Sequence, residues 1–263
     1  MPTAPINGAT VHFRDKGAGP AVVLLHGFPL SHAMWDAQVD ALAGHYRLIA
    51  PDFRGFGKST NPTGPFTIRQ LADDVHALAQ HLSLDKFVLG GLSMGGYVAL
   101  AYAAAYPQTL RGLMLVDTKA QADTAEAKET RDRMIDIARR KGAAAIAQAM
   151  LAKLIPESAA DARPQLVRDL ETMMESTDPD TIAHALAAMR DRPDYVDSLG
   201  SIDVPTLVLG GDLDAITPPD VMATLHERIP RAVHRTVPMA GHMSPMEQPQ
   251  LVTVAIEQFL KSL

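Results

Sequence analysis

Cysteine is absent from this chain of 263 residues. Its absence excludes disulfide bonds, a thiol nucleophile and any metal site built on thiolates. Aromatic residues are also scarce, at 5% of the chain, and only one of them is a tryptophan, Trp35. No apolar run approaches the roughly 20 residues that a membrane-spanning helix needs, and the N-terminus lacks a basic segment followed by an apolar one. The sequence therefore predicts a cytoplasmic protein with no membrane partner.

Blocks of like charge are missing too. The 24 basic and 30 acidic residues are scattered, and they leave a net charge of -6. Nothing in this distribution favours nucleic acid as a partner, so a small-molecule substrate fits better. The chain is 47% hydrophobic, which is ordinary for a globular protein, and it is long enough for one large α/β domain or two small ones. The oligomeric state cannot be predicted from these features.

Short apolar runs recur along the chain, and segments with helical spacing separate them. Strands are predicted at 10–14, 21–25, 46–50, 87–89, 110–116, 204–209 and 232–237. Helices are predicted at 30–42, 67–82, 97–106, 218–228 and 247–263. Strands that alternate with helices imply right-handed crossovers, and hence a mostly parallel sheet with helices on both faces.

Residues 118–200 interrupt this alternation. They contain no strand-like run, and helical patterns are found at 126–141, 143–154, 164–176 and 179–190. Five of the 13 methionines lie here, but no aromatic residue precedes Tyr195. We interpret 118–200 as a helical cap (lid) inserted into a core domain that consists of 1–117 and 201–263.

One serine is flanked by glycines at the end of a predicted strand. Residues 90–96 read GGLSMGG, after an apolar run and before an Ala-rich segment. A strand, a sharp turn and a helix would force Ser93 into a strained conformation, and a Cβ at Gly91 or Gly95 would collide with neighbouring backbone. The start of the helix would favour negative charge near the hydroxyl of Ser93. The pattern predicts a nucleophile, although a Gly-rich turn with an inert serine remains the alternative from this segment alone.

Two further residues follow strands at the same predicted edge of the sheet. Asp214 comes after the strand at 204–209, and His242 comes after the strand at 232–237. Sites in parallel sheets lie beyond the carboxyl ends of the strands, so these residues and Ser93 are candidates for a catalytic triad. His242 would take the proton of the serine hydroxyl, and Asp214 would fix the imidazole tautomer. Asp117 and Asp212 remain open as alternatives for the acid.

The other histidines have less distinctive surroundings. His26 also follows a strand, but its place in His-Gly-Phe-Pro predicts that it braces a loop. Surface or packing roles are expected for His12, His32, His45, His76, His81, His184, His226 and His234. Asp52 and Arg54 are expected to pin their own loop. No His, Asp or Glu spacing is typical of a metal site and no glycine loop would cradle a phosphate, so we predict neither a metal nor a cofactor.

Five segments together resemble the α/β-hydrolase fold family across nearly the whole chain. They are His26-Gly27-Phe28-Pro29, 52–59, Gly91 to Gly96, Gly211 to Asp214, and Gly241-His242 with Glu247 and Pro249. The resemblance implies about eight strands, mostly parallel, and a triad in the order Ser93, Asp214, His242. It assigns the oxyanion hole to the backbone amides of Phe28 and Met94.

The resemblance is greatest to the serine carboxylesterase and enol-lactone hydrolase branch. It implies a carboxylic ester hydrolase that forms an acyl-enzyme from small or medium acyl esters, with lactones as a further class. The expected walls of the substrate pocket are Pro29, Leu30, Trp35, Phe56, Met239 and Met243, with core packing equally open for Trp35. Two alternatives stay open: a perhydrolase or carbon–carbon bond hydrolase on the same triad, and a non-catalytic ligand-binding protein of this fold.

Overall fold

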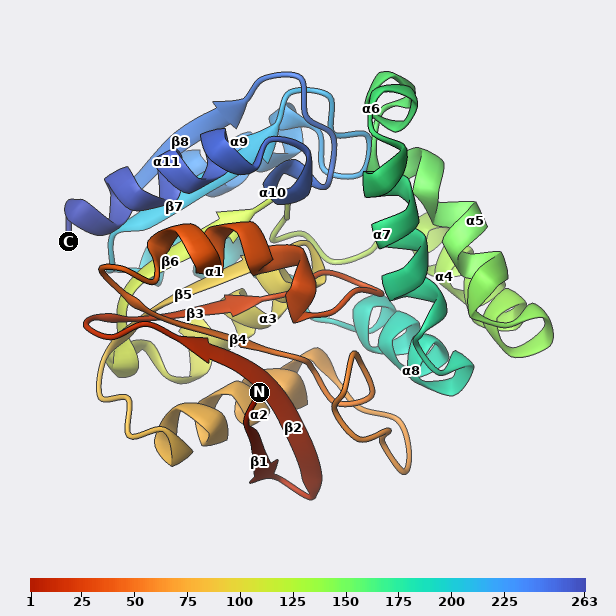
Figure 1. The fold of residues 1–263 in the computed structure, drawn as a ribbon, viewed down its shortest axis with the longest axis horizontal. Helices are drawn as coiled ribbons and strands as arrows, with labels where there is room; N and C mark the ends of the chain where they lie inside the picture. Colours follow the sequence, from red (N-terminus) through yellow and green to blue (C-terminus); the bar gives the residue numbers. More distant parts are fainter.

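An eight-stranded sheet forms the centre of the protein in a computed structural model that describes residues 1–263 (Figure 1). Along the sheet the strands follow the order β1-β2-β4-β3-β5-β6-β7-β8. Only β2 runs antiparallel to its neighbours β1 and β4, and the remaining pairs are parallel. The strands are β1 Thr3–Ile6, β2 Ala9–Lys16, β3 Ala21–Leu25, β4 Arg47–Pro51, β5 Phe87–Leu92, β6 Leu110–Val116, β7 Thr206–Gly211 and β8 Ala232–Val237. The prediction of about eight mostly parallel strands is confirmed.

Continuous apolar runs form the central strands because helices cover both faces of the sheet. Successive side chains of β3 point to opposite faces: Val22 and Leu24 join one hydrophobic cluster, while Val23 and Leu25 join the other. The first cluster is covered by α1 (Asp36–Leu42) and α11 (Pro249–Lys261). The second is covered by α2 (Ile68–His81), α3 (Met94–Ala105) and α9 (Pro219–Arg228).

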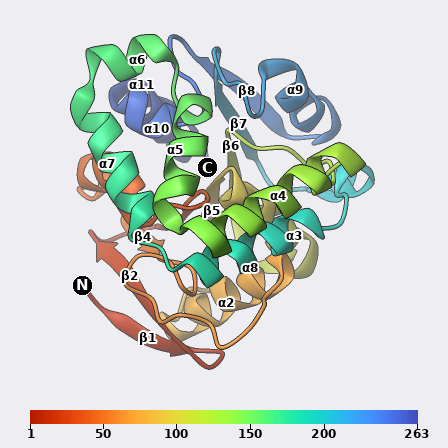
Figure 2. The same ribbon diagram turned by 90° about the vertical axis from the view of Figure 1, so that its right-hand side faces the viewer.

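A helical insertion separates β6 from β7, within the range 118–200 that the sequence singles out. Its helices are α4 Ala125–Lys141, α5 Ala143–Leu154, α6 Glu157–Ala162, α7 Pro164–Glu175 and α8 Pro179–Arg190, followed by the 3-10 turn η3, Val196–Ser201. They gather beyond the end of the sheet toward which the β3 arrow points in Figure 1, and α4, α5 and α7 lie toward the viewer in Figure 2. The short α6 was missed, because six residues carry too little periodicity to be recognised.

Several elements differ from the prediction, including the helix predicted at 30–42, which is the 3-10 turn His32–Trp35 followed by α1. The edge strand β1 was missed, although the Asn7-Gly8 turn that joins it to β2 is a common hairpin signal and has positive φ at both residues (44° and 80°). Helix α3 begins at Met94, directly after Ser93, rather than at residue 97. The closing helix is divided into α10 (Ser244–Glu247) and α11, because Pro249 has no amide hydrogen to continue α10.

The 3-10 turns η1 (His32–Trp35) and η2 (Pro107–Thr109) complete the fold. None of the helices combines the length and the apolar character that a membrane span requires.

Candidate active site

Ser93 lies at the turn between β5 and α3, with φ of 53° and ψ of -112°. The turn is so tight that a Cβ on Gly91 would stand 2.1 Å from the carbonyl oxygen of Gly95, and a Cβ on Gly95 would stand 2.5 Å from that of Leu25. The expected collisions are therefore confirmed. Only glycine fits at these two positions, and the strained backbone of Ser93 persists because the surrounding structure holds it.

Backbone contacts hold Ser93 and leave its hydroxyl free. The amide of Ser93 donates to the carbonyl of Val116 (3.0 Å), and the hydroxyl of Thr118 donates to the carbonyl of Ser93 (2.8 Å). The side-chain oxygen makes no hydrogen bond within the protein, and the residue is half-buried. No internal hydrogen bond of this hydroxyl would have to break for it to contact a ligand.

His242 and Asp214 meet at the same edge of the sheet, although 28 residues separate them. Nδ1 of His242 lies 2.8 Å from Oδ2 of Asp214. The same carboxylate accepts hydrogen bonds from the amides of Ile216 (2.7 Å) and Thr217 (3.0 Å) and from the hydroxyl of Thr217 (2.6 Å). Burial alone would raise the pKa of Asp214, but the hydrogen bonds from His242 and Thr217 lower it to about 2. Asp214 is therefore ionised at neutral pH.

An ionised carboxylate can only accept hydrogen bonds, so the proton of neutral His242 resides on Nδ1. That tautomer leaves Nε2 with a lone pair that can accept a proton. His242 is 2% exposed, so the imidazole is held within the protein rather than in solvent. This is the orientation that general-base chemistry needs.

Neither alternative acid contacts His242. Asp117 accepts a hydrogen bond from the amide of Gly211 (2.8 Å) and another from the hydroxyl of Ser244. Its burial, and the neighbouring charge of Asp214, raise the pKa of Asp117 well above its usual value. Asp212 is exposed and accepts the amide of Ala240 (3.3 Å). Among the three candidates, Asp214 alone is placed to orient the imidazole.

Two backbone amides at this edge are available to an outside acceptor. The amide of Phe28 donates no hydrogen bond within the protein. Met94 is the first residue of α3, where helix geometry leaves the amide without an intrahelical acceptor. Both positions are those expected for the oxyanion hole, and the positive end of the α3 dipole adds to their effect.

His26 fixes the loop that carries Phe28. Its Nε2 accepts the amide of Phe53 (3.0 Å), so Nδ1 holds the proton and donates to the carbonyl of Gly27 (2.8 Å). Burial lowers the pKa of His26 to about 4, so the ring is neutral at pH 7. Its ring also packs against Phe53, with ring centroids 4.6 Å apart. These contacts agree with the expected bracing role.

A family model described as the alpha/beta hydrolase fold matches residues 20–249. The chain belongs to this family. It is 43% identical, with a TM-score of 0.96, to a thermophilic esterase from Thermogutta terrifontis, over 99% of this chain and 97% of the esterase. An enol-lactonase from Burkholderia xenovorans is 30% identical with a TM-score of 0.93, over 99% and 100% of the two chains. The 3-oxoadipate enol-lactonase 2 of Acinetobacter baylyi is 29% identical over 97% of this chain and 93% of its own.

Most of the expected pocket residues lie deep in the protein. Leu30, Trp35, Phe56 and Met243 are at most 1% exposed. The indole nitrogen of Trp35 donates to the carbonyl of Leu25 (3.1 Å), so the structure favours core packing for this residue. Pro29 is also buried, and its carbonyl faces the hydroxyl of Thr177 at 3.5 Å. Met239 is 70% exposed and lies on the surface. Their contact with substrate remains a prediction.

One crevice, with a volume of about 570 Å³, contains none of these residues. It lies between η1, the start of α7 and α10, and Met34, Arg163, Leu166 and Met246 are among the residues that line it. The sequence gives no signal for Arg163, because nothing local shows that α7 packs beside α10. The crevice also contains none of Ser93, Asp214 and His242.

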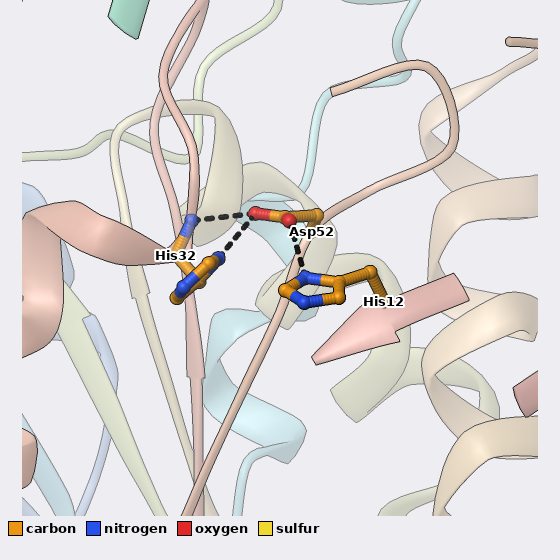
Figure 3. A group of neighbouring side chains, drawn as sticks. All are labelled: His12, His32 and Asp52. Carbon is orange, nitrogen blue, oxygen red and sulfur yellow. Dashed lines mark hydrogen bonds and ion pairs between the residues drawn. The ribbon is translucent and has the colours of Figure 1, made fainter. Parts of the chain in front are cut away.

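His12, His32 and Asp52 form a buried cluster that could hold a metal ion (Figure 3). Nδ1 of His12 lies 2.9 Å from Oδ2 of Asp52, and Nδ1 of His32 lies 2.8 Å from Oδ1. The amides of His32 (2.8 Å) and Lys58 (3.0 Å) donate to the same carboxylate. Four donors satisfy Asp52 without an ion, so hydrogen bonding alone accounts for the cluster. These contacts, chiefly those of His32, lower the pKa of Asp52 although burial opposes them.

This cluster decides between the two roles expected for His12 and His32. They are 5% and 7% exposed, so packing rather than a surface position describes them, and both are hydrogen-bonded to Asp52. Sequence reasoning missed the cluster because 20 residues separate Asp52 from His32 and 40 separate it from His12. The expected role of Asp52 as the anchor of its loop agrees with its bond to the amide of Lys58. Arg54 pairs with Asp74 (2.6 Å) and also fits that expectation.

Proposed function

We propose that the protein is a serine hydrolase that cleaves carboxylic esters through an acyl-enzyme. The observation that carries this proposal is the 2.8 Å contact between His242 and Asp214, which follow the parallel strands β8 and β7. Ser93 follows β5 in the same parallel part of the sheet, at a strained turn, and we take its hydroxyl as the nucleophile that His242 serves. The available amide of Phe28 and the first amide of α3 supply an anion site beside the serine. Together these groups are what acyl transfer requires.

The chemistry proceeds in two halves. Oγ of Ser93 attacks the acyl carbon while Nε2 of His242 takes the hydroxyl proton. The negative oxygen of the tetrahedral intermediate is stabilised by the amides of Phe28 and Met94. The bond to the alcohol then breaks, and His242 returns its proton to the leaving oxygen. Water, deprotonated by His242, attacks the acyl-serine, and the carboxylic acid leaves as Ser93 regains its proton.

The relatives support the class of reaction. The expected class, a carboxylic ester hydrolase, is confirmed at that level by the esterase and the two enol-lactonases among them. A lactone is an internal ester, so one mechanism serves both substrate kinds. We further propose small or medium acyl esters and lactones as substrates, and a lid role for the helical insertion, which lies beyond the carboxyl ends of the strands (Figure 1).

A panel of p-nitrophenyl esters with increasing acyl length, together with an enol-lactone, tests the proposal. We expect turnover of the shorter esters by the native chain and none above background by Ser93→Ala, with both chains equally folded by circular dichroism. Ester turnover retained by Ser93→Ala would reject the proposed nucleophile. Faster turnover of a vinylogous diketone than of the esters would favour a carbon–carbon bond hydrolase. Faster reaction of the acyl-enzyme with peroxide than with water would favour a perhydrolase. No turnover of any of them would favour a non-catalytic ligand-binding protein.

A further inference from the structure

A buried carboxylate on α10 holds the backbone on both sides of His242. Oε2 of Glu247 accepts the amide of Gly241 (2.9 Å), and Oε1 accepts the amide of Met243 (3.0 Å). Glu247 is 2% exposed, and its two oxygens receive these backbone amides rather than a lysine or arginine side chain. The residues directly before and after His242 are therefore fixed to one side chain.

A buried carboxylate at this position costs desolvation free energy. Burial raises the pKa of Glu247, and the two amides only partly oppose that effect. An apolar side chain of similar size would fill the same space without a desolvation penalty. An apolar side chain, however, could not accept hydrogen bonds from the two backbone amides on either side of His242.

The helical insertion also contacts the loop that carries His242. The amide of His242 donates to the carbonyl of Leu154, at the end of α5 (3.0 Å). A Cβ on Gly241 would stand 2.7 Å from Cδ of Pro156 and 3.3 Å from Oε1 of Glu247. The insertion and the carboxylate therefore both approach Gly241 closely, and they leave no room for a side chain at position 241.

A second contact joins the insertion to Glu247 itself. The guanidinium of Arg163, just before α7, donates to the backbone carbonyl of Glu247. The amide of Glu247 in turn donates to the carbonyl of Met243 (2.8 Å). The segment from Gly241 to Glu247 is therefore held by its own hydrogen bonds and by two residues of the insertion, Leu154 and Arg163.

We propose that Glu247 is a positioning residue: it keeps the ring of His242 aligned with Asp214, and Arg163 and Leu154 make that alignment depend on the position of the helical insertion. This inference deepens the proposed function and rests on it for its catalytic meaning. Glu247 touches neither the substrate nor the reacting atoms. It acts through the backbone of His242, and the contact that it protects is the 2.8 Å hydrogen bond to Asp214.

Glu247→Gln tests this role with little change of shape. The amide side chain keeps one oxygen for one of the two backbone amides, but its NH₂ group faces the other, so one hydrogen bond is lost. Glu257→Gln is the matched control, because Glu257 lies on α11, is partly exposed and pairs only with Lys261 (2.7 Å). Folding of both variants is checked by circular dichroism.

The direct readout is the low-field proton NMR resonance of Nδ1–H of His242, assigned by its loss in His242→Gln. In Glu247→Gln we expect this proton to exchange with water about tenfold faster, the effect of losing one hydrogen bond, and no change in Glu257→Gln. For ester turnover we expect kcat to fall about tenfold while KM stays within about twofold, because substrate contacts are untouched. A folded Glu247→Gln with unchanged exchange and kcat would overturn the proposal.

Arg163→Gln tests whether the alignment of His242 depends on the helical insertion. It also serves as the test of the proposal if Glu247→Gln does not fold. We expect about threefold faster exchange of the same proton, since only one of the contacts around the loop is lost. Native exchange in Arg163→Gln would overturn the dependence on the insertion. The exchange rate of this proton is measured without substrate, so it reports on Glu247 whether or not the chain hydrolyses esters. A chain that turns over no ester would refute the proposed function alone.

Discussion

Nδ1 of His242 donates a hydrogen bond of 2.8 Å to Oδ2 of Asp214, and the other hydrogen bonds to this carboxylate come from Ile216 and Thr217. A single short turn after β7 therefore fixes the acid, and the acid fixes the imidazole. Because the carboxylate is ionised, the proton of His242 stays on Nδ1 and Nε2 keeps its lone pair, which in the proposed mechanism takes the proton of Ser93. Four changes to the chain or its solution test this arrangement and the buried polar groups elsewhere in the fold.

Asp214→Asn should lower kcat for ester hydrolysis by roughly 10³-fold or more, since the amide can turn an NH₂ group toward His242 and favour the wrong tautomer. KM should change little, because no substrate contact is removed. Steady-state kinetics measure the effect. The control is Asp212→Asn, an exposed neighbour that does not touch His242, and it should retain nearly native kcat. Equal losses in the two variants would argue against the assignment of the acid.

Gly91→Ala should severely destabilise the protein, by more than about 4 kcal/mol, because its Cβ would stand 2.1 Å from the backbone oxygen of Gly95. Gly44→Ala is the comparison, since a Cβ there meets nothing within 4 Å. The free energy of unfolding in urea should remain near native for Gly44→Ala. A Gly91→Ala protein of native stability would mean that the turn carrying Ser93 is less constrained than described.

Asp52→Asn should lower the free energy of unfolding by about 2 to 4 kcal/mol, because the amide cannot accept all four hydrogen bonds that the carboxylate receives. Its NH₂ group would face the imidazole of His12 or the amide of Lys58. Urea unfolding measures the loss, and Asp85→Asn, at an exposed position, provides the control. If added Zn²⁺ raised the stability of the native chain but not of Asp52→Asn, the cluster would be a metal site rather than a hydrogen-bonded anchor.

Acidification should weaken the fold through His26. Its pKa is about 4 in the folded protein against an ordinary value of 6.5, so the unfolded chain binds more protons between these values. Stability is therefore full above pH 6.5 and falls as the pH drops toward 4, by up to about 3 kcal/mol from this group. Urea unfolding at pH 7 and pH 5 measures the slope. In His26→Asn the slope should be smaller, and an unchanged slope would exclude His26 as its source.

Much of the fold follows from local patterns. Apolar runs such as 21–25 and 204–209 are readable as strands because both of their faces are buried, and the residues after them lie at one edge because parallel strands end together. Position 93 was predictable for the same reason, with glycines that only a tight turn requires. The strand β1 could have been found from the Asn7-Gly8 pair.

Other features depend on packing that no local pattern records. His12, His32 and Asp52 come from three separate elements, and only the folded chain brings them together (Figure 3). Trp35 is equally compatible with a core and a pocket wall until its partner, the carbonyl of Leu25, is known. The backbone hydrogen bonds that Glu247 and Leu154 accept around His242 could not be predicted either. Contacts of backbone amides do not produce a pattern in the spacing of side chains.

Covalent labelling of the native chain with diethyl p-nitrophenyl phosphate, followed by tryptic digestion and mass spectrometry, tests the central claim most directly. The reagent phosphorylates activated serines, and cleavage after Lys86 and Arg111 releases residues 87–111 as one peptide. We expect one phosphoryl group per chain, on Ser93, with release of one equivalent of p-nitrophenol and loss of ester turnover. Absence of the label from Ser93 in a chain that still hydrolyses esters would contradict the proposed site.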